Sequence, residues 1–225
     1  GLLGLAWVLL GYSSLFELGL GRATVKNVSS LSNLEDIPAV VWTPFWIQLG
    51  IAILVLAVGW PLMPLLTQGM ESGEPNIAHI FRLFLVALLP VLPMSILRSA
   101  LEGGQHFGVV NLLKGTGLSL MFLTPLAGGL WGLRLVDIVA LMVVWQVGLF
   151  LAYLNVCVAK FPILKTASVW PRIDLVKPLL RFGGWTSVYQ LSILLTYADR
   201  LLLGLKGAMG EAELHVLKAR LQGGI

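Results

Sequence analysis

The chain has 225 residues, of which 57% are hydrophobic and 12% are charged. An ordinary soluble domain has about 25% charged residues, and a soluble core of this size could not cover the long apolar runs that the sequence contains. A soluble globular protein is therefore excluded. The net charge of +4 reflects where the loops carry basic residues, so it does not predict nucleic-acid binding. The single cysteine, Cys157, excludes an intramolecular disulfide.

Uncharged apolar runs predict about six transmembrane helices. Residues 37–70 contain no charged side chain, and about 20 apolar residues cross the ~30 Å hydrocarbon layer of a bilayer as a helix. The expected spans are roughly 1–20, 41–66, 80–98, 115–134, 138–158 and 182–203. The sequence therefore predicts an all-α integral membrane protein whose loops are too short for a separate aqueous domain.

Basic side chains gather in the loops on one side of these spans, which the positive-inside rule makes cytoplasmic. These residues are Arg22, Lys26, Arg98, Lys114, Lys160, Lys165, Arg172, Lys177 and Arg181. The other side carries Arg134 and, near the end of the last span, Arg200 and Lys206. Gly1 would then lie outside, so we expect one further span before it.

The segments that follow the first span have distinct characters. A polar cytoplasmic segment leads to Asp36, and Pro90 and Pro93 in the third span predict a kink that faces a bundle interior or a cavity. A packing kink without a transport role fits equally well. Residues 160–181 mix apolar and basic side chains, which is typical of a cytoplasmic amphipathic linker at the membrane interface. Residues 205–225 form a polar tail that is too short to span.

Two ionisable residues at membrane depth are candidates for a substrate cavity. Arg82 lies about one turn inside the outer end of its span, where it either extends to the interface or faces a cavity. Glu17 lies near the inner end of the first span and could pair with Arg22 or serve a functional site.

The last predicted span carries a stripe of polar and aromatic side chains. The spacing i, i+4, i+7, i+11, i+14 places these side chains on one helix face. They are Trp185, Tyr189, Ser192, Thr196 and Asp199. Because lipid would reject Asp199, the stripe should face protein or water, either along a transport path or in a packed contact.

The sequence contains no recognisable catalytic or cofactor-binding arrangement. His79, His106 and His215 lie in separate segments without the spacing of metal ligands. We therefore expect neither an enzyme nor a resident cofactor or metal.

Several motifs resemble those of bacterial polysaccharide (O-antigen-type) flippases. Residues 15–23 read LFELGLGRA, similar to the family's LxDLGLGRA with Glu17 in place of Asp. Residues 97–107 read LRSALEGGQHF, similar to LRGxLEGxQRF with His106 where Arg is common. Residues 180–185 and 197–204 read LRFGGW and YADRLLLG, similar to the family's seventh helix. The motifs stand in the family's order across about residues 1–204.

The resemblance implies the fold of the multidrug/oligosaccharidyl-lipid/polysaccharide exporter superfamily, with two six-helix bundles around a central cavity, as in MATE-type exporters. This chain would hold helices two to seven. Residues 1–159 would form five helices of the N-terminal bundle, 160–181 the linker, and 182–204 the first helix of the second bundle. The tail does not resemble the family, which suggests a truncated or frame-shifted end.

The function that the resemblance implies is movement of a polyprenyl-pyrophosphate-linked oligosaccharide across the bacterial cytoplasmic membrane. Cavity-facing cations such as Arg82 would balance the pyrophosphate. Coupling to H⁺ or Na⁺ would use Glu17 or Asp199. A MATE-like small-molecule antiporter and a non-transporting fragment or assembly partner are the alternatives.

Overall fold

The computed structural model describes residues 17, 19–31, 33–67, 77–166, 168–181 and 184, and these residues form helices joined by short turns. The chain divides into two compact units, Gly1–Gly184 and Trp185–Ile225. All of the described residues belong to the first unit. The helices are α2 (Leu20–Ser30), the 3₁₀ turn η1 (Leu34–Asp36), α3 (Ile37–Thr67), α4 (Ile77–Gly103), α5 (Phe107–Leu130), α6 (Leu135–Lys160) and α7 (Ile163–Thr166). Residues 173–181 are also helical.

In the described part of the chain, four helices are long and apolar enough to cross a membrane. They are α3, α4, α5 and α6, which correspond to the second to fifth predicted spans, so the expectation of an all-α membrane fold is confirmed. The first and sixth predicted spans lie outside the described residues, apart from a few residues at their ends. The polar segment before Asp36 differs from the prediction, because residues 20–30 form the helix α2.

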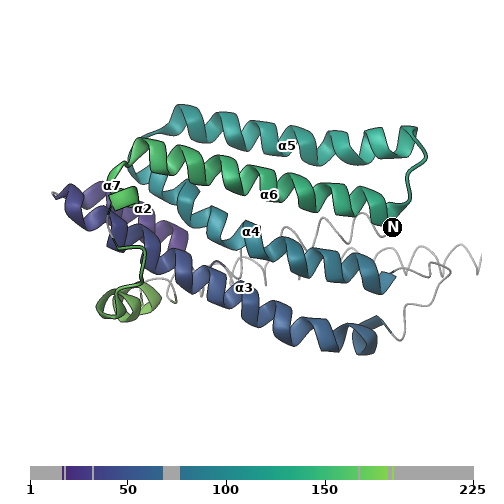
Figure 1. Ribbon diagram of the computed structural model, residues 1–225, viewed down its shortest axis with the longest axis horizontal. Coiled ribbons are helices and arrows are strands. Elements are labelled where there is room, and N and C mark those ends of the chain that lie inside the picture. The colour runs from purple at the N-terminus through teal and green to yellow at the C-terminus, as the bar shows by residue number, and fades with distance from the viewer. Residues whose placement is uncertain are drawn as a thin grey trace, which may run out of the picture. The chain divides into compact units, whose positions relative to one another are not determined.

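Helix α4 is the central element of the described bundle. It packs against α2, α3, α5 and α6, whereas α5 otherwise contacts mainly α6. Figure 1 shows the four long helices running side by side, with α2 and α7 near the ends of α3 and α4 that lie at the left. These ends correspond to the side that the basic residues predict to be cytoplasmic, and we call them the inner ends.

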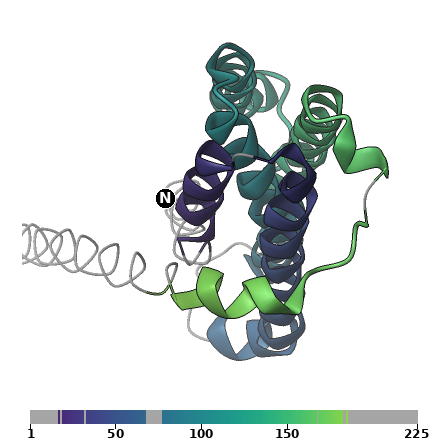
Figure 2. The ribbon, with the colours of Figure 1, turned by 90° about the vertical axis from the view of Figure 1, so that its left-hand side faces the viewer.

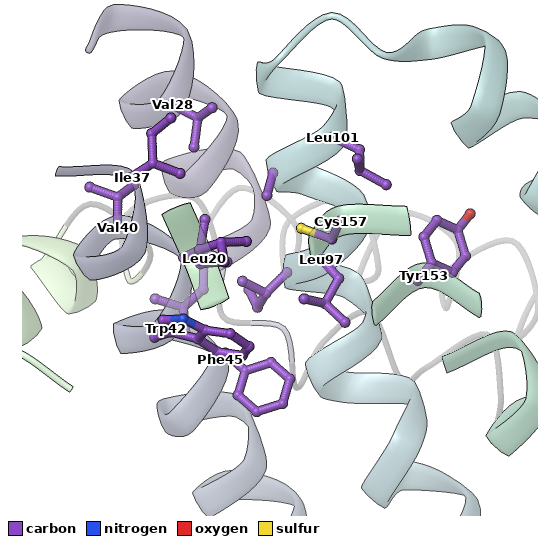
Figure 3. Close-up of a cluster of buried hydrophobic side chains, with 14 of the residues drawn as sticks. Leu20, Val28, Ile37, Val40, Trp42, Phe45, Leu97, Leu101, Tyr153 and Cys157 are labelled. Carbon is purple, nitrogen blue, oxygen red and sulfur yellow. The ribbon is translucent and has the colours of Figure 1, made fainter. Parts of the chain in front are cut away.

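The larger hydrophobic core lies at the inner ends. Leu20 of α2, Val41 of α3, Leu97 and Leu101 of α4 and Cys157 of α6 are all fully buried there. Figure 3 shows how side chains from these helices meet, with the aromatic rings of α3 beside Leu20. Because burial of apolar surface is the main favourable term in protein packing, this cluster fixes the inner ends of the four long helices relative to one another.

Helices α5 and α6 expose large apolar side chains along much of their length. Leu118, Phe122 and Leu126 on α5 and Val144 and Leu151 on α6 are each about half exposed or more. A helix with apolar side chains on its open face is suited to lipid or to another hydrophobic helix rather than to water. These faces are therefore available to the bilayer or to further helices.

The two prolines of the third predicted span lie within the continuous helix α4, and both are buried. Each proline leaves one backbone carbonyl of the preceding turn without its helical hydrogen bond. Ser95, two residues beyond Pro93, is also buried and donates its hydroxyl to the Leu92 carbonyl at 2.8 Å. The expectation that this helix segment faces the bundle interior agrees with the buried positions of both prolines.

Glycine at the end of α5 has a specific backbone role. Gly132 has φ +68°, and the amides of Gly132 and Leu133 donate to the carbonyls of Gly129 and Gly128 at 3.2 and 2.9 Å. This is the Schellman arrangement, in which a left-handed residue ends a helix. Gly128 is buried, and a Cβ there would lie 2.6 Å from Ile138, so the turn and the close packing of α5 on α6 depend on different glycines.

Residues 168–181 attach to the inner end of α3. The Trp46 indole donates to the Val169 carbonyl at 2.6 Å and stacks on Trp170 with ring centres 6.4 Å apart. The Arg172 amide donates to the Thr43 hydroxyl at 3.1 Å. Figure 2 shows the helical segment 173–181, in light green, crossing near α2 and α3. The region predicted as an interfacial linker is thus held by polar contacts to a long apolar helix.

Candidate functional site

The first element of the site is Glu17, which precedes a left-handed turn at Gly19 (φ +64°). The Glu17 carbonyl accepts hydrogen bonds from the Leu20 amide at 2.9 Å and from the Gln48 side chain at 2.6 Å. Because a residue with a Cβ is disfavoured at this φ, glycine at position 19 permits the turn. The turn and Gln48, which is itself fully buried, fix the backbone from which the Glu17 carboxylate extends.

The partner of Glu17 is Arg98 of α4, with Nη2 and Oε1 3.9 Å apart. Arg98 also lies 3.7 Å, measured from Nε, from an oxygen of Glu102 one turn later. The expectation that Glu17 pairs with Arg22 is therefore wrong. Arg22 follows the Gly19 turn and is exposed on α2, so it does not face Glu17. The packing of α2 on α4 brings Arg98 to Glu17 instead.

Lys114 is the second cation of the site. It was expected in a cytoplasmic loop, but the turn between α4 and α5 comprises only residues 104–106, so α5 begins at Phe107. Lys114 lies seven residues further on, which is about 10 Å along the helix axis. In the described part of the chain its ammonium group forms no ion pair.

These side chains meet at a cavity of about 260 Å³ between α4, α5 and α6. The polar lining residues are Glu17, Ser95, Arg98, Lys114, Gln146 and Tyr153, and the remaining walls are mostly Leu, Met and Val side chains. Gln146 Oε1 is buried without a hydrogen-bond partner in the described structure. Tyr153 donates to the Val110 carbonyl at 3.5 Å, which is at the outer limit for a hydrogen bond.

The lining of the cavity carries two cations, Arg98 and Lys114, and one carboxylate, Glu17. Glu102 contacts Arg98 without lining the cavity, so an anion can bind the two cations where it takes the place of a carboxylate. Arg98 and Lys114 lie one to two helical turns inside the inner ends, whereas Gln146 lies 14 residues, about 21 Å, from the inner end of α6. The cavity therefore extends from near the inner surface toward the middle of the bundle.

Arg82, the principal cationic candidate from the sequence, does not line this cavity. It lies 16 residues before Arg98 on α4, about 24 Å away along the axis. Its guanidinium carbon lies 5.3 Å from the centre of the Trp60 ring of α3. Its Nε is buried and has no hydrogen-bond partner among the described residues. The arginine thus makes a cation–π contact near the outer end.

The remaining candidates from the sequence divide into residues that the structure describes and residues that it does not. Tyr189, Ser192, Thr196 and Asp199 lie outside the described residues. His79 is exposed, and His106 packs edge-on against Phe161 with ring centres 5.7 Å apart. Among the described residues, no group of three His, Cys, Asp or Glu side chains could hold a metal ion.

A sequence signal for Arg98 and Lys114 existed in the motif between them. Residues 103–106 read GGQH, a composition that permits a very tight turn. Arg98 lies five residues before Gly103 and Lys114 seven residues after Phe107, so a tight hairpin of two helices places both at a similar depth. The same charges also stand at the borders of apolar runs, and this pattern predicts a loop around Lys114.

No protein-family model matches the chain, and no solved structure matches it. The chain is 24% identical over 214 residues to a Shigella flexneri protein named "Putative O-antigen transporter", and the match covers 90% of this chain and 49% of that protein. It is 76% identical over 29 residues to "Uncharacterized protein y4bA/y4pH" of Sinorhizobium fredii, covering 13% of this chain and 4% of that protein.

The chain therefore spans about half the length of the transporter that it matches. The similarity is distant, but it extends over most of the chain, and the described residues contain four helices suited to a membrane. Together these observations indicate a helical membrane protein with distant similarity to the protein named "Putative O-antigen transporter".

Proposed function

We propose that the chain is part of a flippase that moves an oligosaccharide linked to a polyprenyl pyrophosphate across the bacterial cytoplasmic membrane. The observation that carries this proposal is the cavity between apolar helices that Arg98 and Lys114 line. The distant similarity to an O-antigen transporter supports the same substrate class. Delivery of the oligosaccharide to the outer leaflet would serve surface polysaccharide synthesis.

The physical task of such a transporter is to shield sugar and pyrophosphate from hydrocarbon. The pyrophosphate would enter the cavity, where Arg98 can bind two of its oxygens at once and Lys114 adds a point charge. The sugar hydroxyls would meet hydrogen-bonding side chains such as Gln146. The polyprenyl tail is apolar and would remain outside, against the exposed apolar faces of α5 and α6.

Release on the other side requires a second wall that moves relative to this bundle. In transporters built from repeats, one bundle rocks against the other about a substrate site near the middle of the membrane. We propose that further helices supply this wall, since the chain spans about half the matched transporter. Glu17 and Asp199 are the candidate carboxylates for coupling to H⁺ or Na⁺.

The proposal is tested by binding of a fluorescent polyprenyl-diphosphate oligosaccharide to the 225-residue chain in nanodiscs, followed by translocation in vesicles. Arg98→Gln or Lys114→Gln should weaken binding about tenfold or more, because a hydrogen bond to a charged group contributes about 1.5–3 kcal/mol. Lys160→Gln is the matched control, since Lys160 is exposed at the end of α6 and the charge change is the same.

Each outcome of this experiment has a defined meaning. Equal binding by all four proteins would refute the role of the cavity. Binding without translocation would favour an assembly partner that needs a second bundle, and export of cationic drugs without lipid binding would favour a MATE-like antiporter. Arg82→Ala should slow translocation and leave binding at the inner cavity unchanged, because Arg82 lies near the opposite end of α4.

A further inference from the structure

Arg98 is shared between two carboxylates, and neither contact is tight. The separations of 3.9 Å to Glu17 and 3.7 Å to Glu102 are longer than the 2.7–2.9 Å that is typical of charge-assisted hydrogen bonds. The side chain of Arg98 is 34% exposed and that of Glu17 is 23% exposed. Ion pairs of this kind contribute little free energy, so a better ligand can displace the carboxylates from Arg98.

The charged neighbours of Glu17 come from two helices. Helix α4 supplies Arg98 and Glu102, and α5 supplies Lys114 across the cavity. Among the described residues, helix α6 supplies no charged side chain here, and its titratable group is the phenol of Tyr153. Helix α3 supplies the neutral Gln48. The only charged side chain of α2 near the turn, Arg22, is exposed. Residues 1–16 contain no charged side chain in the sequence. Among the residues that the structure describes, the local sum is thus two cations and two carboxylates.

We propose that an anionic substrate group enters this cavity by exchange: its oxygens replace Glu17 at Arg98, and Glu17 takes up one proton from water. The exchange rests on the proposed function, because it assigns the coupling step to the same cavity. The O–H bond of the new carboxylic acid forms as an O–H bond of a hydronium ion in the solvent breaks, and no other covalent bond changes. The proton comes from the solvent on the side from which the anion enters.

The charge balance explains the proton uptake. A diphosphate diester carries two negative charges, so its entry without a proton would leave two more negative than positive charges among these groups. One proton on Glu17 halves this excess. A carboxylate that has lost its cation and gained an anionic neighbour in a partly buried site favours its neutral form. Entry of the anion and uptake of the proton therefore favour each other.

The test is the pH dependence of binding of a short-chain polyprenyl diphospho-sugar to the full chain in nanodiscs. This diester is chosen because its own charge does not change between about pH 5 and pH 8, so any pH dependence belongs to the protein. Wild-type binding should tighten as the pH falls, by up to about tenfold per pH unit for one linked proton. Calorimetry in buffers of different ionisation enthalpy should show uptake of up to one proton.

Glu17→Gln should remove this pH dependence and, at about pH 8, bind about two- to fivefold more tightly than wild type, because it removes a weak competitor for Arg98. Glu102→Gln is the matched control. It loses a contact of similar length to the same arginine but does not line the cavity, so the pH dependence should remain.

The outcomes separate this inference from the proposed function. Weaker binding by Glu17→Gln, or an unchanged pH dependence in that variant, would overturn the exchange. A binding enthalpy of the wild type that is the same in all buffers would show that no proton is taken up, and this result would also overturn the exchange. That measurement needs no variant. Binding that depends on Arg98 and Lys114 but not on pH would overturn the exchange and leave the proposed function standing. If wild type does not bind the diester at any pH, the proposed function fails as well.

Discussion

Gly103 at the end of α4 and Gly104 and Gln105 in the following turn each meet a different steric demand. A Cβ on Gly103 would lie 2.8 Å from the Val28 side chain and 2.9 Å from the Val25 carbonyl of α2. A Cβ on Gly104 would lie 2.5 Å from the Phe161 ring. Gln105 follows with φ +60°. The two glycines thus bring α4 close to α2 and to the end of α6.

Gly103→Ala should destabilise the chain by about 1–3 kcal/mol, the usual cost of overpacking, because the backbone carbonyl of Val25 cannot move aside as a flexible side chain could. Gly115→Ala is the control, since a Cβ there would meet no atom within 4 Å. It should be neutral or slightly stabilising in the helix. Thermal unfolding in detergent measures both changes, and equal melting temperatures for the two variants would contradict the packing argument.

For single residues, the sequence predicted which side chains are unusual for a membrane helix better than it predicted the side chains that they contact. The sequence predicts Glu17 as an ionisable group at membrane depth, but its pairing with Arg98 depends on the tertiary contact between α2 and α4. Lys114 was assigned to a loop, because a charge inside an apolar run resembles the end of a span. Its aliphatic stem can lie along apolar neighbours while the ammonium group reaches the cavity. To predict this position of Lys114, one must know where α4 and α6 lie beside α5.

Among the elements, the four long described helices were predicted well because their apolar runs are bounded by charges or tight turns. Helices α3 and α4 extend the predicted spans by a few residues, since helices continue beyond the hydrocarbon layer. Helix α5 begins eight residues earlier than the predicted residue 115. Helix α2 was missed because its polar exposed face hides the buried face of Leu20, Ala23 and Val28.

The attachment of residues 168–181 to α3 gives an element-scale prediction. Trp46→Phe keeps an aromatic ring beside Trp170 but removes the donor to the Val169 carbonyl. Exchange of the Arg172 amide with deuterium should then speed up about two- to tenfold, the effect of one net hydrogen bond. Trp131→Phe, at an exposed indole beyond α5, should leave the rate unchanged. If both variants exchange like wild type, the indole does not hold the linker.

The pH behaviour of this attachment follows from Arg172. Its side chain hydrogen-bonds Asp174, with Nη2 and Oδ2 2.8 Å apart, and lies 3.8 Å from Asp36. The hydrogen bond lowers the pKa of Asp174. A carboxyl whose pKa is lower in the folded protein stabilises above its ordinary pKa and loses that effect as the pH falls through the lowered value. The Arg172 amide should therefore remain protected at about pH 5 and lose protection only in stronger acid.

For the whole molecule, the distribution of charge predicts orientation. Lys160, Lys165 and Arg172 lie at or beyond the inner end of α6, whereas the turn after α5 carries Arg134. By the positive-inside rule the inner ends face the cytoplasm. Arg98 and Lys114 belong to the cavity rather than to loops, yet the remaining basic residues keep the same bias. The orientation therefore does not depend on the two residues that were misassigned.

Cysteine labelling in intact cells tests this orientation. Arg134→Cys should react with a membrane-impermeant maleimide from outside, whereas Ser168→Cys should react only after the cells are permeabilised. Both positions are exposed. The unsubstituted chain is the control, because its single cysteine, Cys157, is fully buried and should remain unlabelled. The opposite pattern for the two variants would invert the topology.

The short turn at residues 104–106 also sets the rotational phase of α5. Each residue added between this turn and Lys114 would rotate the lysine by about 100° around the helix axis. One extra residue there would leave the hydropathy, charge and length of the span almost unchanged. It would nevertheless turn the Lys114 side chain away from the cavity. Four extra residues would restore the direction to within about 40° but move the lysine about 6 Å farther along the axis. A helix with such an insertion could still cross the membrane, but Lys114 would no longer lie at its position in the cavity.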